Sequence, residues 1–248
     1  MIKLEKPSNA DPFYLIVLAG GFGTRLKAIS KSIPKSLIPI HGHVFLDIVL
    51  AQALKSRPDR IILCLHYNVE AFNNYLHNRN FAVDVSTLVE DIPLGTGGAI
   101  KNAFDHFPEM KIAAVINSDT LSKLNLREML DSFYKYQATA MMGLSKVDDR
   151  SRYGSVSVNG NMVSSFSEKN ISAEGWINNG NYILSRKIFE GMKRQFSIED
   201  DLFKKLVKSS RLMGYKVHDD DFFDIGTPID YIRFTREFKG SYYDIKIK

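Results

Sequence analysis

Short apolar runs alternate with segments of helical periodicity along the first half of the chain. The runs with the length and β-branched content of buried strands are residues 14–18, 61–65, 83–89 and 112–116. The segments whose apolar residues recur at helical spacing are 44–55, 69–78, 97–107 and 126–136. This alternation predicts an α/β fold with a mostly parallel central sheet and helices on both faces. In such a sheet, ligands collect outside the carboxyl ends of the strands.

The second half begins with a different pattern. Strand-like residues 153–158 and 162–167 flank Asn159-Gly160, a strong hairpin signal, so a small antiparallel insertion is expected there. Further helices are expected over 185–194, 200–210 and 228–238, and further strands over 176–184 and 212–217. No linker composition marks a boundary. We therefore expect one domain over residues 1–248, Rossmann-like, with 1–12 and 240–248 as terminal extensions.

Composition and charge narrow the function classes. The 248 residues are 44% hydrophobic, which is enough for one sizeable core, and the net charge of +5 suits an anionic small molecule. No basic runs with interleaved aromatics indicate nucleic-acid binding, and no signal segment or membrane-length apolar run is present, so a cytoplasmic protein is expected. The single cysteine, Cys64, excludes an internal disulfide and lies in an apolar run typical of a core residue.

A cluster of glycines and basic residues follows the first apolar run. The residues of this cluster that could bind phosphate are Gly20, Gly21, Gly23, Arg25 and Lys35. Glycines let backbone N–H groups approach an anion closely, and the two side chains add full positive charge. The pattern is not a dinucleotide fingerprint, because Leu26 stands where a third glycine belongs, and it is not a Walker A loop, because no glycine precedes Lys35-Ser36. A purely structural glycine turn is the alternative.

These residues resemble the two-part signature of the sugar-1-phosphate nucleotidyltransferases. Residues 20–26 match GG-x-G-T-R-L, and residues 34–39 match P-K-x-L-x-P. The resemblance extends over about 13–238 and is greatest to the heptose-1-phosphate guanylyltransferases within the family. It implies transfer of a nucleotidyl group from an NTP, with GTP favoured, to a sugar 1-phosphate, with a heptose favoured. The products would be an NDP-sugar for capsule or lipopolysaccharide synthesis and pyrophosphate.

The resemblance also implies a set of nucleotide contacts. Arg25 and Lys35 would be the catalytic cations, which hold the β,γ side of the nucleotide and the reacting phosphates. The residues implied to bind the nucleotide are Leu18, Gly20, Gly21, Gly23, Thr24, Glu90, Pro93, Gly95 and Thr96.

Two aspartates are candidate ligands for Mg²⁺. Asp119 follows the apolar run 112–116, at the sheet edge where the glycine cluster is expected, and Mg²⁺ commonly binds one or two carboxylates plus substrate phosphates. The family's second metal aspartate matches Asp224 in the segment DIGTPIDY. Either aspartate could instead be a turn or capping residue, since Pro228 marks a helix start that Asp224 or Thr227 could cap.

Glu90 opens the segment EDIPLGTGGAI and is the candidate for reading the base. Guanine presents adjacent N1–H and N2–H donors, which a carboxylate can accept together, whereas uracil or thymine is better matched by an amide. Asp91 competes for this role, and an exposed acid at a strand end is the third interpretation.

Later segments resemble the acceptor side of the family's site. The residues implied to bind the sugar phosphate are Glu168, Lys169, Asn179 and Gly180. Trp176 is the only aromatic residue expected near the substrate. In the segment SIEDDLF, Ser197 and Glu199 match a family pattern, but a helix cap with a first-turn acid explains them equally well, and we favour that structural role.

Two alternatives remain beside the guanylyltransferase, and a third is excluded. One is a uridylyl- or thymidylyltransferase acting on a hexose 1-phosphate, which Glu90 disfavours only weakly. Another is a non-catalytic nucleotide-sugar-binding regulator, which would not need both catalytic cations and both metal aspartates. An NAD-linked oxidoreductase fails at Leu26. A homodimer is left open.

Overall fold

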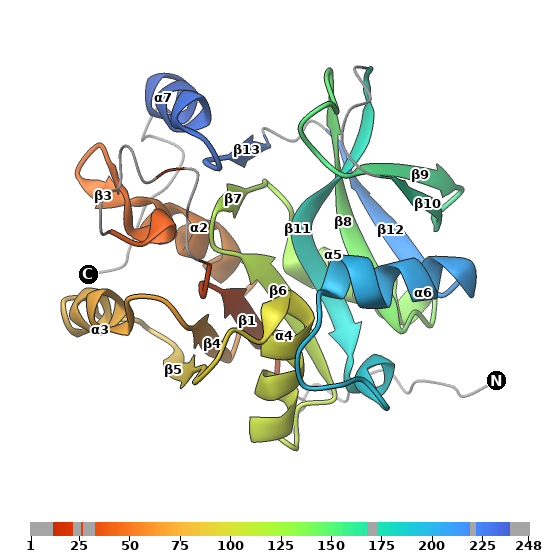
Figure 1. Ribbon diagram of the computed structural model, residues 1–248, viewed down its shortest axis with the longest axis horizontal. Coiled ribbons are helices and arrows are strands. Elements are labelled where there is room, and N and C mark those ends of the chain that lie inside the picture. Colours follow the sequence, from red (N-terminus) through yellow and green to blue (C-terminus); the bar gives the residue numbers. More distant parts are fainter. Residues whose placement is uncertain (1–11, 22–25, 27–32, 168–172, 219–221, 239–248) are drawn as a thin grey trace.

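The computed structural model describes residues 12–21, 26, 33–167, 173–218 and 222–238. Its main feature is a nine-stranded sheet of order β5-β4-β1-β6-β11-β8-β12-β10-β9 (Figure 1). Its strands, in chain order, are β1 (Tyr14–Leu18), β4 (Arg60–Leu65), β5 (Asp84–Val89), β6 (Ile112–Asn117), β8 (Ala140–Val147), β9 (Ser155–Asn159), β10 (Met162–Ser167), β11 (Gly175–Ser185) and β12 (Leu212–Val217).

The first half of the sheet is parallel and the second half is mixed. β5, β4, β1 and β6 all pair in parallel, as the alternation of strands and helices predicts. Beyond β6, β11 runs antiparallel to both β6 and β8, and β12 then pairs in parallel with β8. The α/β class is therefore confirmed, with a sheet that is mixed as a whole. The predicted hairpin, β9–β10, forms the far edge of this sheet.

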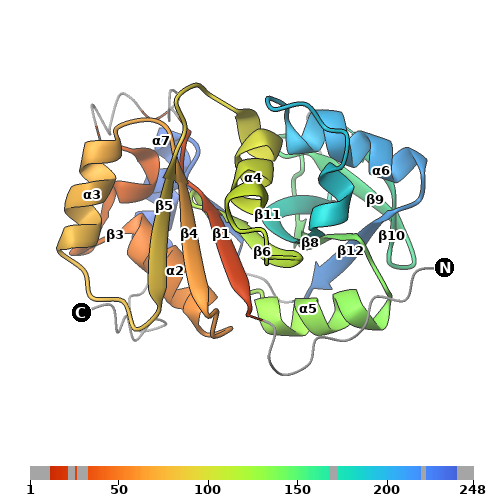
Figure 2. The same ribbon diagram turned by 90° about the horizontal axis from the view of Figure 1, so that it is seen from below.

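Helices cover both faces of the sheet (Figure 2). One face packs against α2 (Phe45–Leu54), α3 (Val69–His77), α5 (Leu126–Lys135) and α7 (Pro228–Glu237). The other face packs against α4 (Gly95–His106), the π-helical segment η4 (Ile198–Phe203) and α6 (Lys204–Lys208). Because β1 alternates between these cores, with Leu15 in the first and Ile16 in the second, it is apolar at every position. None of the helices in these described ranges has the length and apolarity needed to cross a bilayer.

Strand β11 has an irregularity beside the ends of the parallel strands. Its pairing with β8 is interrupted between Asn178 and Tyr182, where Gly180 has φ +78°. A Cβ on Gly180 would lie 2.6 Å from Asn117 Nδ2 and 2.9 Å from Thr120 Oγ1, so only glycine permits this approach.

Two short ladders lie outside the main sheet. β2 (Pro39–Ile40) pairs with β3 (His43–Val44), just after the 3₁₀ turn η2 (Lys35–Leu37). β7 (Thr120–Leu121) pairs with β13 (Phe223–Asp224), which brings together segments about a hundred residues apart in sequence. This second ladder places Asp224 opposite Thr120, the neighbour of Asp119.

The structure differs from the expectations for the second half in four places. Strand β8 was not among the predicted strands. The helix expected over 185–194 is wrong, because Ser185 ends β11 and only the 3₁₀ turn η3 (Arg186–Phe189) follows. The helix expected over 200–210 begins earlier, as η4, and continues as α6. The hairpin turn is shifted by one residue, since Asn159 pairs with Met162 and leaves residues 160–161 as the turn.

Candidate active site

A cavity of about 420 Å³ opens at the carboxyl ends of the parallel strands β1, β4 and β6. Its walls are the segment after β1, the residues that follow β4 and β6, the start of α4 and the turn η2. The residues that line it are Leu18, Ala19, Gly20, Gly21, Lys35, Ser36, Cys64, His66, Glu90, Pro93, Gly95, Thr96, Ala99, Asn117, Ser118, Asp119 and Gly226. This is the position where parallel sheets bind ligands.

All the predicted nucleotide and catalytic residues that fall within the described ranges line this cavity. The residues of that set found in the lining are Leu18, Gly20, Gly21, Lys35, Glu90, Pro93, Gly95 and Thr96. The remaining three, Gly23, Thr24 and Arg25, lie outside the described residues.

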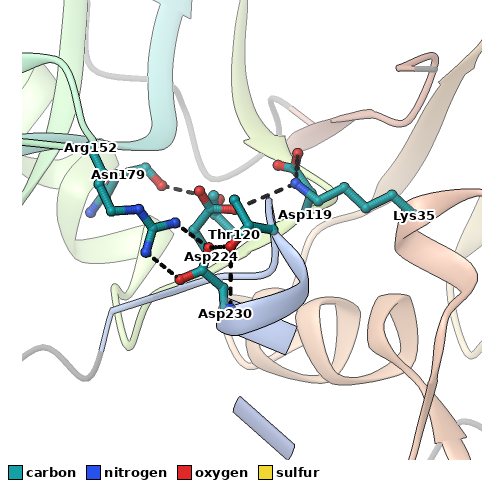
Figure 3. Close-up of polar contacts among 8 residues, drawn as sticks. Lys35, Asp119, Thr120, Arg152, Asn179, Asp224 and Asp230 are labelled. Carbon is teal, nitrogen blue, oxygen red and sulfur yellow. Dashed lines mark hydrogen bonds and ion pairs between the residues drawn. The ribbon is translucent and has the colours of Figure 1, made fainter. Parts of the chain in front are cut away.

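Three charged side chains meet at one end of the cavity (Figure 3). Lys35 Nζ donates to Asp119 Oδ2 at 2.8 Å and to Asp224 Oδ1 at 3.4 Å. The Lys35 side chain is 11% exposed, that of Asp224 20% and that of Asp119 38%, so the lysine is the most enclosed of the three. The two predicted metal aspartates thus face a single position, which the ammonium group of Lys35 occupies.

Backbone pairing sets the spacing of the two aspartates. In the β7–β13 ladder Asp224 lies opposite Thr120, the neighbour of Asp119, and Ile225 N donates to Asp119 O at 3.2 Å. Lys35 begins the turn η2, whose next residues, Ser36 and Leu37, are buried. All three side chains are therefore carried by short, well-anchored backbone segments. Neither aspartate caps α7, because Thr227 does so by accepting from Asp230 N.

The electrostatics of this cluster suit a divalent cation. Burial raises the pKa of Asp224; Lys35 opposes that rise, whereas the negative charges of Asp119 and Asp230 add to it. Within the described part of the chain, no group of three or more His, Cys, Asp or Glu side chains could hold a metal. Two carboxylates alone would leave most coordination positions to water and substrate phosphates, which is the arrangement that Mg²⁺ favours. The donor set therefore fits Mg²⁺.

The start of α4 forms the other end of the cavity. Gly95 has φ +74°, and a Cβ there would lie 2.6 Å from the carbonyl oxygen of Phe196. That same oxygen accepts from Gly97 N at 3.1 Å and from Gly98 N at 3.2 Å. Because these first-turn amides already have a partner, this helix start is not set up to bind phosphate and is better suited to a base or ribose.

Glu90 bridges the end of β5 and the start of α4. Its Oε2 accepts from Leu94 N at 3.0 Å, and its backbone oxygen lies 3.0 Å from Nδ1 of His66. Burial raises the pKa of Glu90, although the Leu94 N–H and His66 oppose that rise. Its competitor Asp91 is solvent-exposed, with a side chain 91% exposed. Glu90 therefore supports the loop and also borders the cavity, so the base-reading role stays a prediction.

The predicted acceptor residues are less well matched by the geometry. The side chain of Asn179 is fully buried, where its Nδ2 donates to Ser145 Oγ at 3.1 Å and its Oδ1 accepts from Asn181 N at 3.2 Å. It orders the β11 bulge from the core and does not line the cavity, which corrects the expectation of a sugar contact by this amide. Gly180 also lies outside the lining. Glu168 and Lys169 fall outside the described residues.

Trp176 and the SIEDDLF segment have structural partners. The Trp176 ring lies edge-on to His218, 5.9 Å between centroids, and is not part of the cavity lining. Ser197 caps η4 by accepting from Asp200 N, as the structural interpretation predicts. Glu199 Oε2 accepts from Thr96 Oγ1 at 2.8 Å, which ties the segment to the cavity wall.

Several lining residues were not predicted. His66, Ser36, Asn117 and Ser118 border the cavity beside predicted residues. A usable signal existed for His66, because it directly follows strand β4 and therefore lies at the same sheet edge as Asp119. Cys64 also borders the cavity, but burial raises the pKa of its thiol far above the ordinary range, which agrees with an inert core residue.

The chain is similar to known nucleotidyltransferases over most of its length. The family model described as "Nucleotidyl transferase" matches residues 14–240. The D-glycero-alpha-D-manno-heptose 1-phosphate guanylyltransferase of Aneurinibacillus thermoaerophilus is 35% identical over 90% of this chain and 96% of that protein. The protein of the same name from Campylobacter jejuni is 36% identical over 88% of this chain and 97% of that protein.

A solved structure shows the same fold. The crystal structure of HddC from Yersinia pseudotuberculosis superposes with a TM-score of 0.83 at 36% identity, covering 92% of this chain and all of that chain. A second crystal structure of HddC is a complex with GMP-PN, with a TM-score of 0.81.

The chain belongs to the nucleotidyl transferase family. The resemblance to the sugar-1-phosphate nucleotidyltransferases is confirmed, and with it the prediction of an enzyme of this class.

Proposed function

We propose that this protein transfers a guanylyl group from GTP to a sugar 1-phosphate, with D-glycero-alpha-D-manno-heptose 1-phosphate as the preferred acceptor. The observation that carries the proposal is the contact of Lys35 with Asp119 and Asp224 at the end of a cavity bordered by the glycine segment. A binding module would have no evident use for a lysine enclosed between two carboxylates. The identities of 35% and 36% to two heptose 1-phosphate guanylyltransferases support the choice of base and acceptor.

The reaction requires no covalent enzyme intermediate. A phosphate oxygen of the sugar 1-phosphate forms a bond to the α-phosphorus of GTP, and the bond from that phosphorus to the α,β-bridging oxygen breaks. Pyrophosphate leaves with the electron pair. Because the nucleophile is already an anion, the protein has to align it, neutralise the crowded charge and stabilise the leaving group, and no general base is needed.

Each role falls to a residue with suitable chemistry. Lys35 would stabilise negative charge on the reacting phosphates once they displace it from the aspartates. Arg25 would hold the β,γ-phosphates, and Lys169 would hold the acceptor phosphate with Glu168 on the sugar hydroxyls, as the family resemblance implies. Asp119 and Asp224 would hold Mg²⁺, which supplies positive charge against the phosphates when bound.

The base end of the cavity supports guanine as the substrate base. Glu90 Oε2 accepts from Leu94 N, and because each carboxylate oxygen has two lone pairs, both oxygens can accept a further hydrogen bond. A carboxylate at this wall presents only acceptors, which match the N1–H and N2–H donors of guanine. We further propose that residues 14–240, the extent of the family match, act as a single catalytic domain.

One experiment tests the proposal directly. Pyrophosphate release is measured with GTP, ATP, UTP and dTTP against a panel of sugar 1-phosphates that includes the heptose, mannose and glucose compounds. We expect the highest kcat/KM for GTP with the heptose 1-phosphate. Preference for UTP or dTTP would overturn the guanylyl assignment. Absence of pyrophosphate release from every pair would instead favour a non-catalytic nucleotide-sugar-binding regulator.

A further inference from the structure

The loop before β9 makes two contacts with the segment that carries Asp224. Arg152 donates to both carboxylate oxygens of Asp230, from Nη1 to Oδ1 at 2.6 Å and from Nη2 to Oδ2 (Figure 3). Next to it, the ring of Tyr153 lies edge-on to Phe222, with 5.5 Å between the ring centroids. Two neighbouring residues of the loop are thus fixed to the chain on either side of Asp224.

Asp230 is a buried carboxylate that depends on these partners. It is 1% exposed, and it accepts from Thr227 Oγ1 at 2.6 Å as well as from Arg152. Burial alone would raise the pKa of Asp230, but the hydrogen bonds from Arg152 and Thr227 outweigh burial and hold it below its ordinary value. A buried charge that loses its partner is strongly destabilising, so Arg152 fixes Asp230, and with it the first turn of α7.

The first turn of α7 is one of two anchors for Asp224. On one side the β7–β13 ladder pairs Asp224 with Thr120, and Ile225 N donates to Asp119 O. On the other side, three residues after Asp224, Thr227 caps α7 and is hydrogen-bonded to Asp230. The position of the Asp224 carboxylate relative to Asp119 is therefore set from both ends of a very short segment.

We propose that Arg152 is a positioning residue for metal binding: through Asp230 and the start of α7 it holds Asp224 at the spacing from Asp119 that Mg²⁺ requires. This inference rests on the proposed function, because it takes Asp119 and Asp224 as the metal ligands. The planar fork of arginine matches both carboxylate oxygens at once, which a lysine cannot do, so the geometry and the charge of Arg152 both contribute.

The test uses Arg152→Met, which keeps the unbranched aliphatic stem and removes the guanidinium. Loss of a residue that orients a metal ligand typically costs about tenfold or more in metal affinity, and we expect about that rise in the Mg²⁺ concentration for half-maximal pyrophosphate release. The same rise is expected without turnover, in Mn²⁺ binding followed by electron paramagnetic resonance with a non-hydrolysable GTP analogue. KM for GTP at saturating Mg²⁺ should change by no more than about twofold, because the base end of the cavity is untouched.

Two further variants control the result. Arg150→Met removes a guanidinium from the same loop, one that donates to the Ala173 carbonyl at 3.1 Å, and should leave Mn²⁺ affinity unchanged. Arg152→Lys keeps the charge but not the fork, and should weaken Mn²⁺ binding by about threefold. If Arg152→Met does not fold, as judged by circular dichroism and thermal melting, Arg152→Lys decides: wild-type affinity in that variant overturns the inference.

The outcomes separate the inference from the proposed function. A wild-type protein that binds no Mn²⁺ and releases no pyrophosphate would refute the proposed function itself. A wild-type protein that does both, together with Arg152→Met behaving like Arg150→Met, would refute only the positioning role of Arg152.

Discussion

The two ends of the cavity differ in how their polar groups are satisfied. At the base end, the groups around the start of α4 are already bonded within the protein: Gly97 N donates to Phe196 O, and Glu90 accepts from Leu94 N. At the metal end, Lys35 and the two aspartates bond mainly to one another, at 2.8 Å and 3.4 Å. The base end therefore has a preformed shape, whereas the metal end consists of opposite charges in contact.

This difference separates recognition from chemistry. At the start of α4 the polar groups bond within the protein, so this part of the cavity should keep its shape when a base binds. It can therefore discriminate between bases without reorganising. At the charged end we expect partners to exchange, because bound phosphates would compete with the two aspartates for the ammonium group of Lys35, and a cation could then bind between the carboxylates. Substitutions at the metal end should therefore affect turnover and metal requirement, whereas those at the base end should affect nucleotide choice and loop stability.

The largest effect is expected from Lys35→Ala. Removing one preorganised positive charge from the reacting phosphates should lower kcat by about a hundredfold or more, measured as pyrophosphate release at saturating substrates. Lys101→Ala is the control, because Lys101 is paired with Asp105 on the surface of α4 at 2.6 Å. Circular dichroism should show a folded protein in both cases. Near-normal turnover in Lys35→Ala would remove this residue from the chemistry.

Metal dependence should give the next largest effect. EDTA should abolish activity and Mg²⁺ should restore it, and Asp119→Asn should raise the Mg²⁺ concentration for half-maximal rate by about ten- to a hundredfold, since a neutral amide replaces one of two carboxylate ligands. Asp200→Asn removes an exposed carboxylate that is paired with Lys204, and should leave the requirement unchanged. Product formation that persists in EDTA would contradict the metal role of both aspartates.

The base end is tested by Glu90→Gln. The amide keeps an oxygen for Leu94 N but presents N–H₂ towards a donor of guanine, a buried mismatch of about 1–3 kcal/mol. We expect kcat/KM for GTP to fall about tenfold or more, with a smaller loss for UTP. Asp91→Asn changes the exposed neighbouring acid and should leave the ratio of GTP to UTP unchanged. Equal losses for both nucleotides in Glu90→Gln would mean that Glu90 only supports the loop.

The pH dependence of kcat/KM for GTP is an independent test of the base-reading role of Glu90. Because burial raises its pKa, the carboxyl is protonated at a higher pH than an ordinary glutamate. As the pH falls through that raised pKa, an acceptor becomes an O–H donor, so kcat/KM for GTP should fall on the acid side. Glu90→Gln does not titrate and should lack this limb. A limb of the same position in both proteins would assign the titration to another group.

Much of the first half could be predicted from the sequence, because its order follows from local pattern. Strand β1 and helix α5 lie within one residue of their predicted bounds, since a short apolar run followed by glycines and an amphipathic helix each have a recognisable local pattern. Lys35 and Asp119 could be named as candidates because Lys35 lies within a recognisable motif and Asp119 follows the end of a strand. His66 occupies an equivalent strand end and was missed only because a lone histidine has no spacing pattern.

The errors occur where long-range contacts decide the structure. Strand β8 contains Gly143 and two methionines, and it is a strand because β11 and β12 pair with it on both sides. Asn179 matched a family motif in sequence, yet its buried amide donates to Ser145 of β8 and to Ser122, which follows β7. The Arg152–Asp230 pair joins residues 78 positions apart, and no local pattern could have indicated it.

The smallest effect on activity is expected from a matched pair of glycines at and away from the base end. Gly95 and Gly191 have nearly the same left-handed φ, +74° and +73°, but a Cβ on Gly95 would lie 2.6 Å from Phe196 O, whereas one on Gly191 would meet nothing within 4 Å. Alanine in this conformation costs about 1–2 kcal/mol, so Gly191→Ala should lower the free energy of unfolding by that amount in urea titrations and leave KM for GTP unchanged. Gly95→Ala should lose about 1 kcal/mol more, because backbone atoms must shift to relieve the contact, and should raise KM for GTP by about threefold with kcat little changed. If the two variants lose the same stability and the same GTP affinity, the start of α4 is not the rigid wall that the contrast between the two ends requires.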